Sequence, residues 1–179
     1  MRKYQAFEIA FVGLKNEVHH FNYEVDNAFF ESFSPPDFKD SKLSILLTMD
    51  KKDNFFLLNF EITGSIWTVC DRCGDPFEMN IWDEFPLVVK RVGDPKLMQR
   101  ENDDPNMAFI AQQESVMNVA KWVYEFALLS IPMQRIHPND KAGNSTCNPD
   151  AIRALEEMKK GKEEKDNPLW KGLEQFRNK

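Results

Sequence analysis

The sequence predicts an α+β protein: an antiparallel, strongly curled or barrel-like sheet with one main packed helix and a short helical C-terminal tail. Three observations favour this class. Apolar residues alternate with polar ones through most of the first two thirds of the chain, which is the period of a half-buried strand. One later segment changes to helical spacing. Two Asn-Pro pairs, at Asn148 and Asn167, then provide the cap and first-turn proline that begin helices.

The expected strands follow one another along the chain. An opening strand alternates Phe7, Ile9 and Phe11 with more polar neighbours, and a turn or short helix at 26–33 ends before Pro35. The polar turn at 50–54 then joins two strands in a hairpin. The expected sheet strands are 41–50, 55–70, 77–90 and the short segment 107–113.

The main helix is expected over 114–130, where Val119, Val123 and Phe126 share one face, and Pro132 ends it. Residues 91–106 are polar with two Asp-Pro steps and are expected to form a surface loop. We expect one domain over residues 1–147, including the cysteine hairpin, and a helical tail over 148–179 packed on or near it. In the last helix of this tail, Trp170 and Leu173 are expected to dock.

Composition narrows the class of function. The net charge is −6, from 23 basic and 29 acidic residues, which argues against a protein that coats nucleic acid through a broad positive surface. No run of 18 apolar residues predicts a transmembrane helix, and the first residues lack the apolar run of a signal peptide. We therefore expect a cytoplasmic protein, in which thiols stay reduced and a cysteine pair is more often a metal or redox site than a disulfide.

Two of the three cysteines, Cys70 and Cys73, lie in a turn between two expected strands. A Cys-x-x-Cys turn is half of a tetrahedral thiolate site, and Cys147 with His137 can complete it as a structural zinc centre. Nine residues separate His137 from Cys147, more than zinc fingers have, so an ordinary strand-end cysteine, loop cysteine and surface histidine remain an alternative. A redox role has less support, because the thioredoxin Cys-x-x-Cys motif opens a helix, whereas this pair lies between two expected strands.

The sequence shows no nucleophile elbow, phosphate loop or dinucleotide fingerprint. Tryptophan rings can stack on bases, but positions in strands and helices favour core packing for each of the four. If RNA or a protein partner is contacted, the candidate residues are basic side chains near the cysteine turn and at the end of the following strand. These candidates are Arg72, Lys90, Arg91 and Arg135.

Several motifs together resemble the YceD-like family of large ribosomal RNA subunit accumulation proteins. The Cys70-Asp-Arg-Cys73 turn is similar to that family's Cys-x-Arg-Cys, and Glu125 before ALLSIPM is similar to its acidic residue and Leu-Leu-x-x-Pro ending. His137-Pro138, Cys147 and the tail from Asp166 to Leu173 also resemble family features, so the resemblance runs from about Ile45 to the C-terminus. Many members carry further cysteines after the proline, where this chain has His137 and Cys147.

The resemblance implies a non-enzymatic role in the synthesis, processing or stability of 23S ribosomal RNA, and hence in assembly of the large ribosomal subunit. Its partners would be that RNA or ribosomal assembly proteins, with no membrane and no small-molecule substrate. The alternative is a small zinc-dependent hydrolase or nuclease, in which three of the four ligands hold zinc and leave the fourth position to water.

Overall fold

The computed structural model describes residues 4–93 and 104–163, with side chains described as far as Lys159. The chain divides into two compact units. The sheet unit comprises Met1–Thr68 and Glu78–Met133, and the tip unit comprises Val69–Phe77 and Gln134–Lys179. Each unit is described by itself below. The expected division into one domain at 1–147 and a helical tail at 148–179 packed on or near it stays a prediction.

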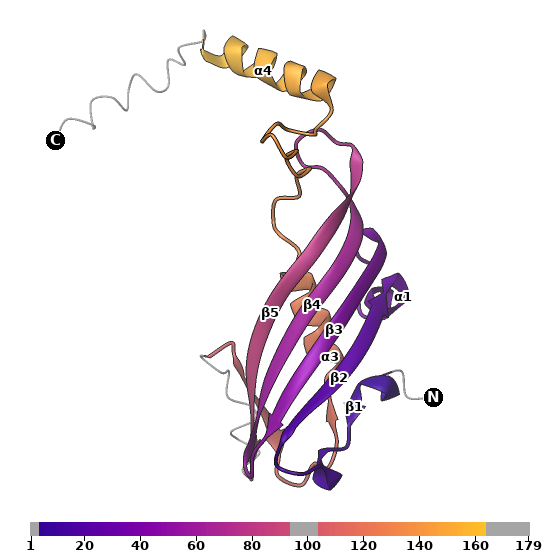
Figure 1. Cartoon of the computed structure of the whole chain (residues 1–179), viewed down its shortest axis with the longest axis vertical. Helices are drawn as coiled ribbons and strands as arrows, with labels where there is room; N and C mark the ends of the chain where they lie inside the picture. The colour runs from indigo at the N-terminus through magenta and orange to yellow at the C-terminus, as the bar shows by residue number, and fades with distance from the viewer. Residues whose placement is uncertain (1–3, 94–103, 164–179) are drawn as a thin grey trace, which may run out of the picture. The chain divides into compact units, whose positions relative to one another are not determined.

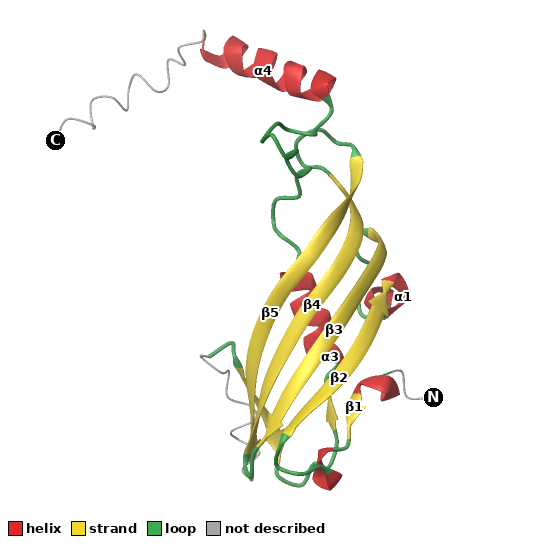
Figure 2. Ribbon diagram, in the orientation of Figure 1, coloured by secondary structure: helices red, strands yellow, loops and turns green. Residues whose placement is uncertain are grey.

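The sheet unit is built on a five-stranded mixed sheet (Figure 2), whose strand order is β2-β3-β4-β5-β6. Consecutive strands from β2 to β4 pair antiparallel, whereas β6 pairs parallel with β5, with Val88 opposite Met107. The strands are β2(Val18–Asp26), β3(Lys39–Lys51), β4(Phe55–Val69), β5(Pro76–Val92) and β6(Met107–Ala111).

One face of this sheet is apolar because the strands alternate. On β3, Leu43, Ile45 and Leu47 are fully buried, and β4 continues the layer with Phe60 and Ile62. The expected hairpin of β3 and β4 around the polar turn is confirmed by their antiparallel register.

A glycine lies where the pairing of β3 and β4 becomes irregular. Gly64 lies at φ 142°, and a Cβ there would fall 2.0 Å from the backbone carbonyl oxygen of Lys42. The register between the two strands shifts at the same place, between Lys39 and Lys42. Only glycine allows this close approach of two backbones.

The buried face is covered by helix α3(Ala120–Leu129), which lies behind the sheet in Figure 1. The Phe126 ring lies 5.0 Å from Phe60 and 4.9 Å from Phe85, measured between ring centroids. Helix α1(Asn27–Glu31) adds Phe30, which is fully buried, and begins at Asp26, whose carboxylate accepts a hydrogen bond from the Phe29 amide. A two-stranded sheet of β1(Glu8–Ile9) and β7(Met117–Asn118) completes the unit.

The expected fold class is wrong. The protein is mostly β, and the sheet is neither purely antiparallel nor strongly curled or closed. It stays open because its edge strands, β2 and β6, each have a single neighbour. The parallel strand β6 is what makes the sheet mixed.

The expected single main helix is also wrong, because helical residues are divided among three helices in the described part of the chain. The segment at 114–130 is helical only from Ala120, since Met117 and Asn118 pair with β1. The Asn118 side chain then accepts a hydrogen bond from the Ala120 amide and starts α3. No helix of the described residues has both the length and the apolar character needed to cross a membrane.

The N-terminal strand prediction is wrong as well. Residues expected to form one strand instead form two single-turn 3-10 helices, η1(Gln5–Phe7) and η2(Phe11–Gly13), on either side of β1. Phe7, Ile9 and Phe11 are nevertheless all buried. The alternation of apolar and polar residues therefore predicted burial correctly but did not predict the backbone conformation.

The tip unit contains the turn at 70–75, the loop at 134–148 and helix α4(Pro149–Glu163). The predicted helix start at Asn148 is confirmed, because its side chain accepts a hydrogen bond from the Asp150 amide at 3.0 Å. Residues 91–106 lie partly, and Trp170 and Leu173 wholly, outside the described residues. In the described part of the tip unit, only Cys70, Phe77 and Cys147 are buried apolar residues.

Candidate metal centre

The turn at 70–75 is a tight loop that carries two thiols. Its ends are joined by a hydrogen bond from the Cys70 amide to the Asp75 carbonyl at 2.9 Å, and the Gly74 amide donates to the Cys70 carbonyl at 2.9 Å. Gly74 has φ 78°, a conformation that glycine adopts without strain. The short closed turn brings both cysteines to the same end of the unit.

The loop at 134–148 folds back on itself, which explains the wide spacing of the other two candidate ligands. The Asp140 carboxylate accepts hydrogen bonds from the amides of Asn144 at 2.8 Å and Ala142 at 2.9 Å. The Asn144 bonds, the largest cause, lower the pKa of Asp140. Asn139 and Ser145 then form an antiparallel bridge, so the nine residues between His137 and Cys147 make a small closed loop.

Hydrogen bonds join this loop to the cysteine turn. The Asp71 amide donates to the Arg135 carbonyl, and the Arg135 amide donates to the Asp71 carboxylate, both at 2.7 Å. At the other end of the loop, the Asn148 side chain donates to the Asp75 carboxylate at 3.1 Å. The two aspartates therefore hold both ends of the loop against the turn.

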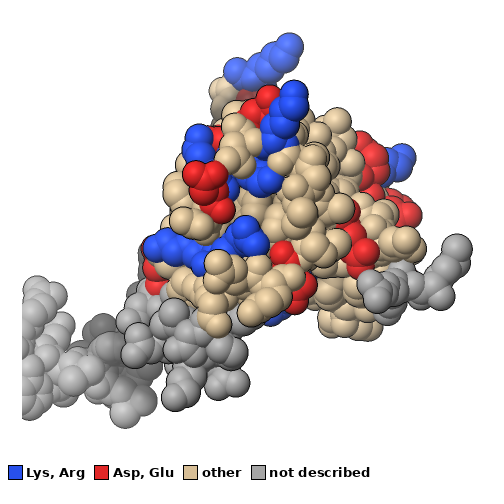
Figure 3. All heavy atoms as spheres, turned by 90° about the horizontal axis from the view of Figure 1, so that it is seen from below, with Lys and Arg blue, Asp and Glu red and all other residues tan. Residues whose placement is uncertain are grey.

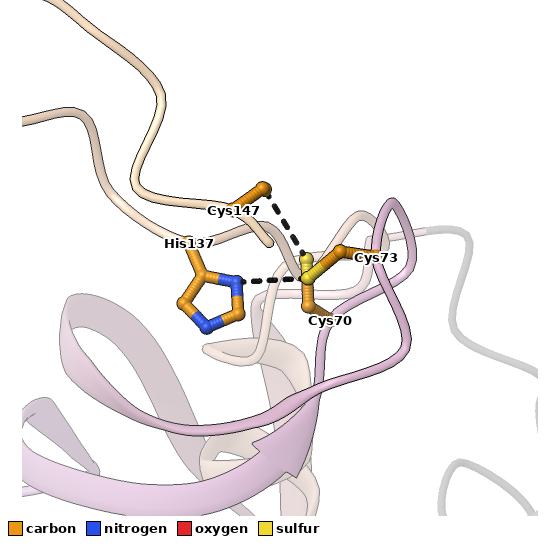
Figure 4. Close-up of side chains that lie close together, drawn as sticks. All are labelled: Cys70, Cys73, His137 and Cys147. Atoms are coloured by element: carbon orange, nitrogen blue, oxygen red, sulfur yellow. Dashed lines mark hydrogen bonds between the residues drawn. The ribbon is translucent and has the colours of Figure 1, made fainter. Parts of the chain in front are cut away.

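Figure 4 shows the result, with Cys70, Cys73, His137 and Cys147 directed towards one point. The sulfur atoms of Cys70 and Cys147 are 3.8 Å apart, and the Cys73 sulfur is 3.5 Å from His137 Nδ1. The four ligand atoms all lie within 4.8 Å of one another. The three cysteines are free thiols.

These separations fit a tetrahedral ion. With metal–sulfur bonds of about 2.3 Å and metal–nitrogen bonds of about 2.0 Å, neighbouring ligand atoms in a tetrahedron lie about 3.5 to 3.8 Å apart. The two measured contacts have this length, and the remaining pairs need shifts of at most about 1 Å. Because a disulfide would need sulfur atoms about 2 Å apart, the Cys70–Cys147 contact is not one.

The surroundings of the thiols favour one thiolate before any ion binds. Burial raises the pKa of Cys70, but backbone amides, those of Cys73, His137 and Arg72, outweigh it and lower the pKa to about 6. Burial raises the pKa of Cys73, and the adjacent Cys70 sulfur raises it further. Two thiols this close resist a second negative charge, and a cation relieves that repulsion.

The Phe77 ring orients the histidine. Its centroid lies 4.4 Å from that of the His137 ring, and Phe77 is itself buried. This packing fixes the imidazole with Nδ1 towards Cys73. The group can therefore hold a metal ion with three sulfur ligands and one nitrogen ligand.

The predicted RNA or partner contacts fall in both units. Arg72 and Arg135 lie in the tip unit, where Arg72 is exposed and Arg135 half-buried. Lys90 and Arg91 lie in the sheet unit near the end of β5, and the Arg91 side chain donates to the Gln112 carbonyl at 2.6 Å. Arg72 and Arg135 thus belong to one unit and Lys90 and Arg91 to the other. Contact of these four residues with RNA or a partner stays a prediction.

Charge is mixed rather than concentrated on the face shown in Figure 3. Lysine and arginine side chains there alternate with acidic and uncharged ones, without a broad field of one sign. This agrees with the net charge of −6. This face therefore lacks the broad positive surface that would bind many phosphates.

The residues that hold the two halves of the candidate metal site together were not identified from the sequence. Asp71, Asp75 and Asn148 hold the loop to the turn, and the aspartates within and just after the Cys-x-x-Cys motif were the available signal. The expectation of core packing for each tryptophan is wrong for two of them, because Trp82 is 68% and Trp67 42% exposed. Trp122 is half-buried, and Trp170 lies outside the described residues.

The fold and site define a small, mostly β protein with a Cys₃His group suited to a metal ion. The family model described as large ribosomal RNA subunit accumulation protein YceD matches residues 58–177. Because this match covers more than half of the chain, the protein belongs to the YceD family. Searches of curated proteins and of solved structures each found no significant match.

Proposed function

We propose that this protein supports the accumulation of 23S ribosomal RNA, as a non-enzymatic factor that binds RNA or an assembly partner of the large ribosomal subunit. The observation that carries the proposal is the family match, which includes all four candidate metal ligands and all four basic contact candidates. The family is named for accumulation of the large ribosomal RNA subunit. The site of action would be the cytoplasm, where bacterial ribosomes are assembled.

We further propose that Cys70, Cys73, His137 and Cys147 hold one structural zinc ion. Four protein ligands fill a tetrahedral coordination sphere, which is the property of structural zinc sites. The ion would keep the turn and the loop at 134–148 in one arrangement. A surface carrying Arg72 and Arg135 would then bind its target without first having to be ordered.

The alternative, a zinc-dependent hydrolase or nuclease, has less support. Such an enzyme keeps one coordination position for water, which a fourth protein ligand would occupy. The carboxylates of the turn are also engaged, because Asp71 accepts a hydrogen bond from the Arg135 amide and Asp75 from the Asn148 side chain. A free general base is therefore not evident in the turn.

The functional test is the ratio of mature 23S to 16S RNA after depletion of the protein from its source cells. We expect the ratio to fall and to recover when the wild-type chain is supplied. Purified, zinc-loaded protein is incubated with precursor RNA in parallel, and we expect the RNA to stay intact. An unchanged ratio contradicts the proposal, and zinc-dependent RNA cleavage supports the enzyme instead.

The metal test is elemental analysis of tag-free protein. We expect about one zinc per chain, with loss of the ion in Cys147→Ser and retention in Lys141→Ala, a change in the same loop. Because Lys141 is exposed and contributes no ligand atom, it controls for general damage to the loop. Zinc-free wild-type protein with the loop still ordered would contradict a structural ion.

A further inference from the structure

The outer face of the sheet, which is the face directed away from α3, carries an arrangement that the proposed function does not yet use. In Figure 1 no other described helix or strand of the sheet unit lies in front of it. Two hydrogen bonds connect side chains of β4 and β5 on this face: Asn59 donates to Glu84 and Ser65 donates to Glu78, each at 2.7 Å. By the alternation of the strands, Trp82 lies on the same face between these bonds.

Large apolar side chains on this face are exposed to solvent. Trp82 is 68% exposed, and Trp67 and Leu57 are each about two fifths exposed. Leu57 also borders a hollow of about 340 Å³, lined further by Pro86 and Val88. An exposed tryptophan on the same face as an apolar hollow is typical of a binding surface, because tryptophan is enriched among the residues that dominate binding energy.

The charge on the outer face indicates what kind of partner it fits. Carboxylates outnumber lysines on the alternating positions of β2–β5 that face outward. The acidic residues are Glu24, Asp26, Asp50, Glu61, Glu78 and Glu84, against the lysines Lys39, Lys42 and Lys90. Within the described part of the chain, no lysine or arginine forms an ion pair with Glu61, Glu78 or Glu84.

We propose that the outer face binds a basic polypeptide segment of a partner protein. An arginine of that segment can stack on the exposed Trp82 ring while its guanidinium donates to Glu61 or Glu84. An apolar side chain of the same segment can fill the hollow beside Leu57. Trp82 and Pro86 are four residues apart on one strand, about 13 Å, so a single short segment reaches both.

RNA is the less suitable occupant of this face. Its phosphates would meet the carboxylates of Glu61, Glu78 and Glu84, and like charges repel. The proposal rests on the proposed function and makes it more specific, because it assigns a basic protein to the outer face. It leaves RNA to other parts of the molecule.

The binding test uses the zinc-loaded full chain and a short fluorescent peptide of arginine, lysine and leucine. Two variants change the face, Trp82→Ala and Glu61→Gln/Glu84→Gln. A control, Glu31→Gln/Glu114→Gln, removes the same charge at exposed positions outside the strands. We expect each face variant to weaken binding about tenfold or more and the control less than about threefold, at unchanged thermal stability.

Equal weakening by the face and control variants would show only non-specific charge attraction and would overturn the proposal. Binding of a single-stranded RNA oligonucleotide that is lost in Trp82→Ala would overturn it in favour of RNA. A depletion strain separates this proposal from the proposed function. If depletion lowers 23S RNA and Glu61→Gln/Glu84→Gln restores it fully, only the outer-face proposal fails; if depletion has no effect, the proposed function fails.

Discussion

The sheet unit and the tip unit are stabilised by different interactions. The sheet unit buries a continuous apolar layer that includes Phe30, Phe56 and Phe60. In the described part of the tip unit, the buried apolar residues are Cys70, Phe77 and Cys147, and two of these are candidate metal ligands. A unit with so small a core needs a disulfide, a metal ion or a similar cross-link. Hydrophobic burial therefore stabilises the sheet unit, whereas the described part of the tip unit has a small apolar core beside a group of residues that could hold a metal ion.

Removal of the metal should produce the largest difference between the responses of the two units. With a chelator, we expect amide hydrogens at 70–75 and 134–148 to lose their protection, because structural zinc contributes on the order of 10 kcal/mol to small sites. Amides of β3 and β4 should stay protected. Hydrogen exchange measured by mass spectrometry, before and after zinc is restored, checks this. Equal loss of protection in both units would contradict the comparison.

A substitution in the apolar core should destabilise the sheet unit and leave the tip unit unchanged. Phe60→Ala leaves a cavity beneath Phe126 and should lower the free energy of unfolding of the sheet unit by about 3 to 5 kcal/mol. Zinc content should remain that of the wild type. Phe55→Ala, on the same strand but 36% exposed, is the matched control and should cost less than about 1 kcal/mol.

The grouping of Cys70, Cys73, His137 and Cys147 could be predicted from the sequence because it depends on residue type. Three cysteines and one histidine with suitable spacing are few enough to combine in one way. The closed loop between His137 and Cys147 depends instead on hydrogen bonds to Asp140, which a spacing rule for zinc fingers does not contain. The wide spacing was therefore a correct reason to keep an alternative open.

The fold was predicted less well, because its deciding contacts join distant parts of the chain. Strand positions from β3 to β5 follow from local alternation. The parallel pairing of β6 with β5 and the pairing of Met117 with Ile9 are tertiary, and they determine the mixed sheet and the shortened helix. Trp82 illustrates the same limit: its place on a strand could be predicted, but which face stays uncovered could not.

The hydrogen bond between Asp71 of the turn and Arg135 of the loop should have a smaller effect, which is confined to the zinc affinity of the tip unit. Asp71→Ala removes the acceptor of the Arg135 amide and should lower zinc affinity about 10- to 100-fold, as loss of groups that position ligands does. Competition with a chromophoric chelator measures this affinity. Asp150→Ala in α4 is the control, since Asp150 is exposed and its carboxylate pairs with Arg153 in the same helix. Equal affinity of both variants would show that Asp71 does not position the ligands.

The smallest effect on stability is expected for the proposed contact residue in the turn. Arg72 is exposed, so Arg72→Ala should change the free energy of unfolding by less than about 0.5 kcal/mol and leave the zinc bound. Association with large-subunit precursors, measured by co-sedimentation, should nevertheless weaken.

Arg153→Ala provides the matched control for that loss, because Arg153 is an exposed arginine of the same unit and the substitution changes the net charge equally. If the coordinated tip is a recognition surface, the position of the charge matters, and only Arg72→Ala should reduce co-sedimentation. If both variants reduce it equally, the tip acts through overall charge. The metal would then stabilise the tip without presenting Arg72 to a target.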